Sequence, residues 1–219
     1  MTEPLHVDVW SDIACPWCYI GKRRFEAGLA AFDGADDVTV TYHSFELSPD
    51  TPVDYDGSVV DFLFAHKGMA PEQVEQMLSQ VTTIAADVGL DYDFAAVRQT
   101  RTLLAHEALH AARAQGRQLE LVERLFAAYF QEGRHLGSVD ELVALGSEAG
   151  LDGHALRDAL EHGTYADAVA QDISQARQYG IQGVPFYVIG GKYGVSGAQQ
   201  PEVFTQALEQ VRSEQVEAR

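Results

Sequence analysis

The sequence has few cationic side chains and no long apolar run, and both shortages exclude classes of function. Lysine and arginine together number 15 against 33 aspartates and glutamates, so the formal charge is −18. Such an acidic chain repels phosphate backbones and anionic lipids, which argues against nucleic-acid and membrane partners. No apolar run in the sequence approaches the roughly 20 residues that are needed to span a bilayer.

The N-terminal segment MTEPLHVDVWSD also lacks the basic start and the apolar core of a secretory signal. With Met1 as the natural start, we therefore expect a cytoplasmic protein. Hydrophobic residues make up 46% of the 219 residues, which is enough to bury a substantial core.

Cysteine is scarce too, because Cys15 and Cys18 are the only two in the chain, with Pro16 and Trp17 between them. Two cysteines cannot form a disulfide framework, and one bridge across so short a loop would restrict the unfolded chain only a little. Stability is therefore a poor reason for the pair. The alternatives to redox chemistry are a zinc half-site, completed by histidines, and two inert buried thiols.

Hydrophobic periodicity places the cysteines where a strand passes into a helix. Strand patterns cover residues 6–10, 38–47 and 184–191, and helical patterns cover residues 18–32, about 58–179 and 201–211. Within the helical part, Pro71 and Ser138 are predicted to begin helices. The strands at either end of the chain are too few to form a stable sheet alone, so they must pair in one sheet. We therefore expect an α/β domain interrupted by an all-helical insertion. The predicted segments are 1–50 and 166–219 for this domain and 51–165 for the insertion.

The C-P-W-C spacing is suited to thiol chemistry. At the first turn of a helix, unpaired backbone N–H groups and the helix dipole favour a thiolate, which makes Cys15 the predicted nucleophile. Cys18 lies one turn further on the same face, so it can attack a mixed disulfide formed at Cys15. Pro16 fits the first helical turn, and Trp17 offers an apolar surface beside the sulfur. We therefore expect dithiol redox catalysis without a tightly bound cofactor.

The segments SDIACPWCYIGKRRF and GIQGVPFYVIGGKYGVSGAQ together resemble the DsbA family of thioredoxin-fold oxidoreductases, in particular its cytoplasmic FrnE-like branch. The resemblance covers nearly the whole chain. It implies a thioredoxin fold split by a helical domain, with a cis Val184–Pro185 bond beside the dithiol. It also implies that the Val184 backbone pairs with substrate and that Pro16, Trp17, Pro185 and Phe186 shape the binding groove.

The resemblance implies exchange between a dithiol and the disulfide of a protein or a small molecule, as an oxidoreductase or disulfide isomerase. Glutathione or another thiol is a possible redox partner. Secreted DsbA proteins have histidine where this chain has Trp17, so we expect a less oxidising couple here. The related family of glutathione-dependent 2-hydroxychromene-2-carboxylate isomerases typically replaces the first cysteine by serine, and isomerisation of a small aromatic or polyketide-like molecule is the alternative function. A third hypothesis is a binding module whose thiols are incidental.

A second motif, HEALH, matches the H-E-x-x-H pattern of zinc proteases at His106 and His110. Arg113 stands where the longer form of that motif requires glycine, and a third ligand such as Glu123 would have to come from the next helix. The helical projection groups His106, His110 and Arg113 away from the apolar arc. We therefore expect a solvated polar face and no metal, with a substrate-contacting face or a zinc site as alternatives.

Four further charged residues lie close to the dithiol in the sequence. Asp12 is expected to cap the helix, and the alternative is a proton acceptor that tunes the acidity of the thiols. The basic cluster Lys22, Arg23 and Arg24 is expected to be solvated, and the alternative is attraction of an anionic thiol such as glutathione.

Overall fold

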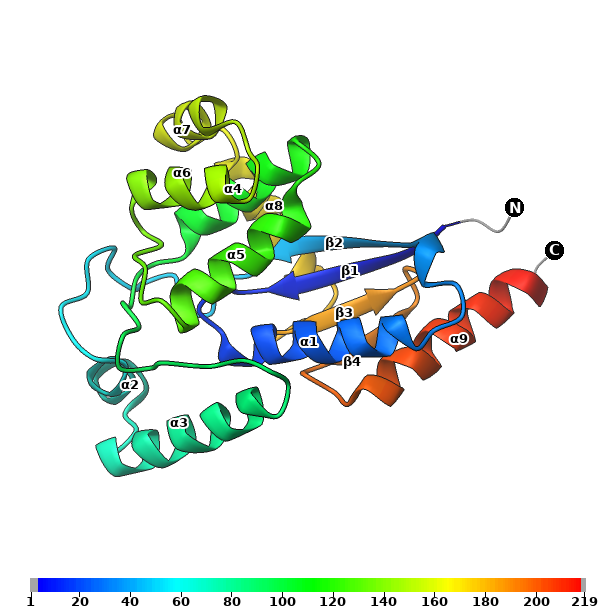
Figure 1. Cartoon of the computed structure of the whole chain (residues 1–219), viewed down its shortest axis with the longest axis horizontal. Coiled ribbons are helices and arrows are strands. Elements are labelled where there is room, and N and C mark those ends of the chain that lie inside the picture. The colour runs from blue at the N-terminus through cyan, green and yellow to red at the C-terminus, as the bar shows by residue number, and fades with distance from the viewer. Residues whose placement is uncertain (1–3, 218–219) are drawn as a thin grey trace.

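A four-stranded sheet joins the two ends of the chain. The computed structural model describes residues 4–217. Strands β1 (Leu5–Ser11) and β2 (Val38–Ser44) are parallel, whereas β3 (Phe186–Ile189) is antiparallel to β1 and to β4 (Tyr193–Ser196). The strand order in the sheet is β2-β1-β3-β4 (Figure 1). Trp10 of β1 lies opposite His43 of β2 on one side and opposite Phe186 of β3 on the other. The prediction that the strand-rich ends share one sheet is confirmed.

Helices α1 (Pro16–Ala30) and α9 (Pro201–Glu217) lie side by side against one face of this sheet (Figure 1). Phe25 of α1 stacks on Tyr187 of β3 and meets Phe204 of α9 edge-on. The close approach of the helices requires Gly28, since a Cβ atom there would lie 2.4 Å from the carbonyl oxygen of Pro201. On the opposite face, Trp10 is buried against residues of and after α8 (Ala166–Gln178).

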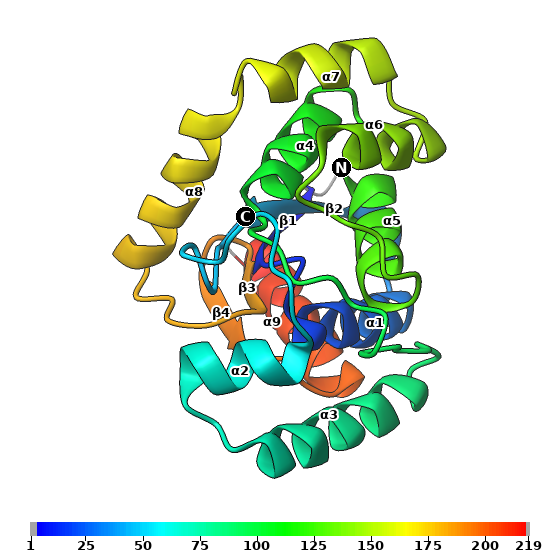
Figure 2. The ribbon, with the colours of Figure 1, turned by 90° about the vertical axis from the view of Figure 1, so that its left-hand side faces the viewer.

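The middle of the chain is helical, as predicted. A short 3-10 helix, η1 (Ala35–Asp37), precedes β2, and the following helices are α2 (Val59–Lys67), α3 (Pro71–Ala86), α4 (Leu103–Ala114), α5 (Gln118–Phe130), α6 (Val139–Glu148) and α7 (Gly153–Glu161). Helices α4 to α7 pack together, whereas α2 and α3 form a separate pair at the other end of the molecule (Figure 2). Pro71 begins α3 and the Ser138 side chain accepts a hydrogen bond from the Glu141 N–H, so both predicted helix starts are confirmed. Within residues 4–217, no helix combines the length and the apolarity needed to cross a membrane.

Candidate active site

The two cysteines lie at the start of α1, the predicted position. Cys15 is the N-cap residue and Pro16 is the first residue of the helix. The backbone N–H of Cys15 donates to the Asp12 carbonyl oxygen over 3.0 Å, which closes the turn between β1 and α1. Both thiols are free, and Cys15 and Cys18 lie 3.6 Å apart. A small rearrangement therefore suffices to bond the two sulfurs.

The environments of the two thiols differ. Burial raises the pKa of Cys18 well above its ordinary value, and the hydrogen bond with Cys15 adds to this effect, although the Ser11 hydroxyl and the Asp12 backbone oppose it. Cys18 is thus held as the protonated thiol. The Cys15 Sγ atom donates to the carbonyl oxygen of Val184 over 3.7 Å, a long sulfur hydrogen bond between residues 169 positions apart.

The loop that carries Val184 closes over the start of α1. The Val184–Pro185 peptide bond is cis, and the Pro185 carbonyl oxygen accepts a hydrogen bond of 2.8 Å from the Gly197 N–H. Gly21 permits this contact, because a Cβ atom there would lie 2.9 Å from Pro185 Cγ. Phe186 points elsewhere: its side chain packs against the Trp10 cluster, on the other face of the sheet.

A cavity of about 300 Å³ opens beside Cys15. Pro16 and Trp17 form part of its wall, and helices α2 and α3 supply apolar side chains from the opposite side. The apolar lining residues outside the C-P-W-C motif are Ala14, Leu47, Val59, Phe62, Leu63, Met77, Leu78, Phe94, Val97, Tyr129 and Phe130. Lys67 is the one cationic side chain among the described residues of the lining. The size and character fit an apolar group of a ligand.

Tyr92, which the sequence analysis did not single out, contacts the dithiol turn directly. Its hydroxyl donates a hydrogen bond of 2.7 Å to the carbonyl oxygen of Pro16. The Tyr92 ring stacks on Phe130, with centroids 4.7 Å apart. The helical segment therefore holds the turn that carries the thiols. Tyr92 lies in a stretch without periodicity or motif, so no sequence signal pointed to it.

Asp12 does not cap α1, and the cap interpretation is wrong. Its Oδ2 atom accepts a hydrogen bond of 2.8 Å from the Leu47 N–H, and its Oδ1 accepts one of 3.3 Å from the Ala14 N–H. These bonds fasten the turn before the helix. The Asp12 side chain lines the cavity beside Cys15, and Nε2 of His106 lies 3.4 Å from its Oδ1.

The HEALH segment is buried, so the expectation of a solvated polar face is wrong. His106 is 1% exposed and His110 is 9% exposed. The reason is that α4 packs against α5, α6, α7 and α8, which leaves little of it open to solvent. Nε2 of His110 lies 3.0 Å from Oδ2 of Asp172 and 3.2 Å from Oγ of Ser44. Among residues 4–217, no three His, Cys, Asp or Glu side chains are grouped to hold a metal ion.

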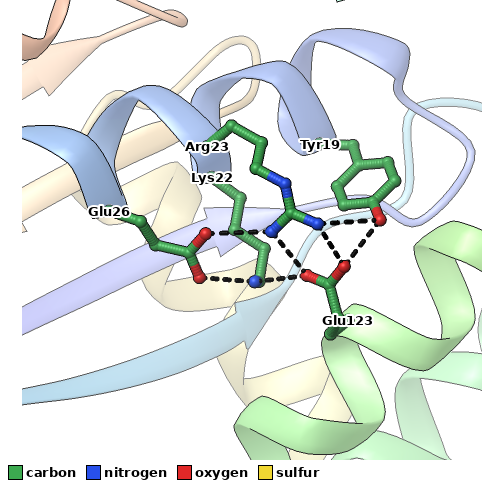
Figure 3. Close-up of polar contacts among 5 residues, drawn as sticks. All are labelled: Tyr19, Lys22, Arg23, Glu26 and Glu123. Carbon is green, nitrogen blue, oxygen red and sulfur yellow. Dashed lines mark hydrogen bonds and ion pairs between the residues drawn. The ribbon is translucent and has the colours of Figure 1, made fainter. Parts of the chain in front are cut away.

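The expectation of solvated charge is also wrong for Lys22, which is 5% exposed. Its ammonium group lies 2.5 Å from Oε1 of Glu26 and 2.5 Å from Oε2 of Glu123 on α5 (Figure 3). Arg23 also pairs with Glu123, which accepts a hydrogen bond of 2.6 Å from the Tyr19 hydroxyl. These contacts form the α1–α5 ion network. Its cations are occupied by protein carboxylates, away from the cavity.

Comparison with known proteins agrees with this geometry. The model of the DSBA-like thioredoxin domain matches residues 6–209. The uncharacterized protein YwbO of Bacillus subtilis is 32% identical over 206 residues, which cover 93% of this chain and 96% of that protein. The crystal structure of a probable DsbA oxidoreductase, SCO1869 from Streptomyces coelicolor, has a TM-score of 0.90 and 42% identity, covering 96% of this chain and 91% of that one.

A more distant structure, the cytosolic disulfide reductase DsbM from Pseudomonas aeruginosa, shares the fold. Its TM-score is 0.63 at 19% identity, with 97% of each chain covered. Three observations point to the same family: the sequence match to the family model, the dithiol at the start of α1, and the helical segment inserted into the sheet domain. The chain belongs to the DsbA-like thioredoxin-domain family.

Proposed function

We propose that the protein is a thiol-disulfide oxidoreductase in which Cys15 and Cys18 exchange electrons with substrate disulfides. The observation that carries this proposal is the pair of free thiols 3.6 Å apart at the helix start, beside the Val184–Pro185 loop. The Cys15 thiolate attacks a substrate disulfide and releases one substrate thiolate. Cys18 then attacks the mixed disulfide, and the second substrate thiolate leaves with the electron pair of the broken bond. Two electrons pass to the substrate, and the protein is left with a Cys15–Cys18 disulfide.

The family and the setting favour reduction or isomerisation over oxidation. We assign the protein to the FrnE-like branch and to the cytoplasm, where the glutathione pool is poised at about −220 to −320 mV. A dithiol there rests mainly reduced unless its potential is very low. Trp17 supplies no charge to stabilise a thiolate, unlike the histidine of secreted DsbA proteins. The name of DsbM, a cytosolic disulfide reductase of the same fold, agrees with this direction.

The substrate is a disulfide-bearing or thiol-bearing protein or small molecule. Pro16 and Trp17 border the cavity beside the attacking sulfur. The Val184 carbonyl oxygen, which now accepts from Cys15, is available to a substrate backbone once the thiol ionises. Pro185 shapes the rim of this groove, whereas Phe186 packs with Trp10 on the other face of the sheet and does not reach the substrate. Glutathione or another small thiol returns the protein to its dithiol state.

Equilibration in glutathione buffers tests the function. The protein is incubated in buffers that span a range of glutathione redox potentials. Free thiols are then trapped by alkylation, and the oxidised fraction is measured by mass spectrometry. A reversible two-electron transition is expected for the native chain. Cys18→Ser should instead accumulate a mixed disulfide at Cys15, and Cys15→Ser should form neither species. The absence of an intramolecular disulfide at every poise would refute the oxidoreductase function.

A second candidate is glutathione-dependent isomerisation of a small aromatic or polyketide-like molecule, favoured by the apolar cavity that opens beside Cys15. Such a reaction needs one thiol-binding position and no resolving cysteine. Cys18→Ser separates the two functions, because it abolishes turnover of a disulfide substrate and leaves isomerisation intact. Turnover that survives Cys18→Ser would therefore favour the isomerase.

A further inference from the structure

A cluster of charged side chains lies on the face of the sheet opposite to α1. The His43 ring on β2 lies between two carboxylates: its Nδ1 atom is 2.8 Å from Oδ1 of Asp172 on α8, and its Nε2 atom is 2.9 Å from Oδ1 of Asp8 on β1. An imidazole donates from both nitrogens only when it is protonated. Although burial opposes the rise, these two hydrogen bonds raise the pKa of His43 to about 9. His43 is therefore a cation at neutral pH.

The Trp10 side chain is held by this cluster through two contacts. The His43 ring stacks on the Trp10 ring, with centroids 4.5 Å apart and planes inclined by 16°. A cation over an indole face is attracted by the ring's π electrons, so the charge of His43 strengthens this contact. The Trp10 Nε1–H group donates a hydrogen bond of 3.1 Å to the Asp172 carbonyl oxygen. Because Trp10 is only 1% exposed, these partners and its apolar neighbours fix the ring in one place.

Trp10 in turn supports the segment that reaches the dithiol. After the end of α8, Ile181 is buried against Trp10, and Val184 packs against the same cluster. The Val184 side chain also contacts the main core on the other side, and its carbonyl oxygen accepts from the Cys15 Sγ atom. A continuous series of contacts therefore runs from the His43 ring, through Trp10, to the loop in front of Cys15.

The Val184 carbonyl oxygen can accept from Cys15 only while Cys15 is a thiol. In the Cys15–Cys18 disulfide the sulfur carries no proton, so this hydrogen bond stabilises the dithiol form alone. We propose that His43 is a positioning residue for the redox couple. Through Trp10 it holds the Val184 carbonyl oxygen against the Cys15 thiol, and it thereby shifts the equilibrium towards the dithiol.

The chain offers a matched control in His110. This residue is also a buried histidine, and its Nε2 atom lies 3.0 Å from the other carboxylate oxygen of Asp172. It stacks on Tyr165, at the start of α8, whereas His43 stacks on Trp10. His43→Gln and His110→Gln therefore make the same chemical change beside the same carboxylate, but only His43→Gln removes the ring that supports Trp10.

The test is the equilibrium of each variant with glutathione at neutral pH. Reduced protein and glutathione disulfide exchange to give the Cys15–Cys18 disulfide and two molecules of glutathione, so the oxidised fraction across a series of glutathione buffers gives the equilibrium constant. A merely structural change destabilises the dithiol and disulfide forms equally and leaves this constant unchanged. The constant therefore reports on positioning and not on general stability.

His43→Gln should favour the disulfide about threefold, the effect of losing one weak hydrogen bond. At about 30 mV for each tenfold change, the midpoint potential falls by about 14 mV. Asp172→Asn keeps the shape of the side chain and removes the charge that faces His43, so it should shift the constant in the same direction. His110→Gln should lose stability in urea but keep the native equilibrium constant.

Two results would overturn the proposal: a constant for His43→Gln that equals the native one or favours the dithiol, or an equal shift for His110→Gln. If His43→Gln does not fold, Asp172→Asn carries the same test, and an unchanged constant for it overturns the proposal too. This role of His43 rests on the proposed oxidoreductase function, but the two fail differently. A native chain that forms no intramolecular disulfide refutes the function, whereas a native constant in His43→Gln refutes the positioning role alone.

Discussion

Replacing Glu123 by glutamine removes the charge at the centre of the α1–α5 ion network. Glu123 accepts hydrogen bonds from Tyr19 and Arg23 and pairs with the buried ammonium group of Lys22 (Figure 3). Glutamine has nearly the same shape, so the variant tests charge and not packing. After the change, Lys22 keeps only Glu26 as its carboxylate partner.

The pKa of Glu123 gives the size of the stability loss that is expected for Glu123→Gln. Burial alone would raise this pKa, but hydrogen bonds from Arg23, Lys22 and Tyr19 lower it from 4.5 to about 2. At about 1.4 kcal/mol for each pH unit, the difference corresponds to about 3 kcal/mol. Because 35% of the side chain is exposed and solvent screens the charge, we expect about 2 kcal/mol. A carboxylate with a depressed pKa stabilises the fold above pH 4.5, and this contribution is lost as pH falls through about 2.

Urea denaturation at a series of pH values is the assay. Glu123→Gln should lower the free energy of unfolding by about 2 kcal/mol at neutral pH, and the difference from the native chain should shrink as pH falls from 4.5 towards 2. Glu120→Gln is the control: this residue lies on the same helix but pairs with Arg117 in solvent, so about 0.5 kcal/mol or less is expected. If both variants lose the same stability, or the loss from Glu123→Gln is independent of pH, the reasoning is refuted.

Two further variants probe contacts that lie outside the C-P-W-C motif. Tyr92→Phe removes the hydrogen bond to the Pro16 carbonyl oxygen, so it should cost about 1 kcal/mol of stability and shift the glutathione redox midpoint, whereas the exposed Tyr179→Phe should do neither. Burial would lower the pKa of His43, but hydrogen bonds to Asp172 and Asp8 raise it from 6.5 to about 9. The protonated imidazole therefore contributes fully to the free energy of unfolding below pH 6.5, and this contribution is lost as pH rises through about 9. In urea denaturation, His43→Gln should lower the free energy of unfolding by about 3 kcal/mol at pH 6 and by far less at pH 10. A loss of equal size at both pH values would contradict this.

The sequence predicted those features of the fold that depend on neighbouring residues. The alternation in residues 38–47 marked a strand, although β2 ends at Ser44, where the chain leaves the sheet. Pro71 and Ser138 marked helix starts because each acts on its own first turn. The DsbA-like thioredoxin fold was also predictable, since two short motifs at opposite ends of the chain resemble the family.

By contrast, the burial of a side chain and the groups that it contacts depend on segments that are distant in sequence. The polar pattern of His106 and His110 predicted a solvated face, yet α4 is enclosed by four other helices. Lys22 can be buried because its ammonium group pairs with the carboxylate of Glu123, 101 residues away in the sequence. The contact of Tyr92 with the dithiol turn crosses 76 residues and follows no local pattern.

By itself, the sequence determined where the dithiol lies in the fold. Spacing along one helix sets the separation of Cys15 and Cys18, and helix geometry is local. Only the tertiary structure decided what surrounds the thiols. Periodicity shows that a helix has an apolar face, but not how many other helices cover it, so the burial of His106 beside Asp12 became visible only when α4 and the turn before α1 were brought together.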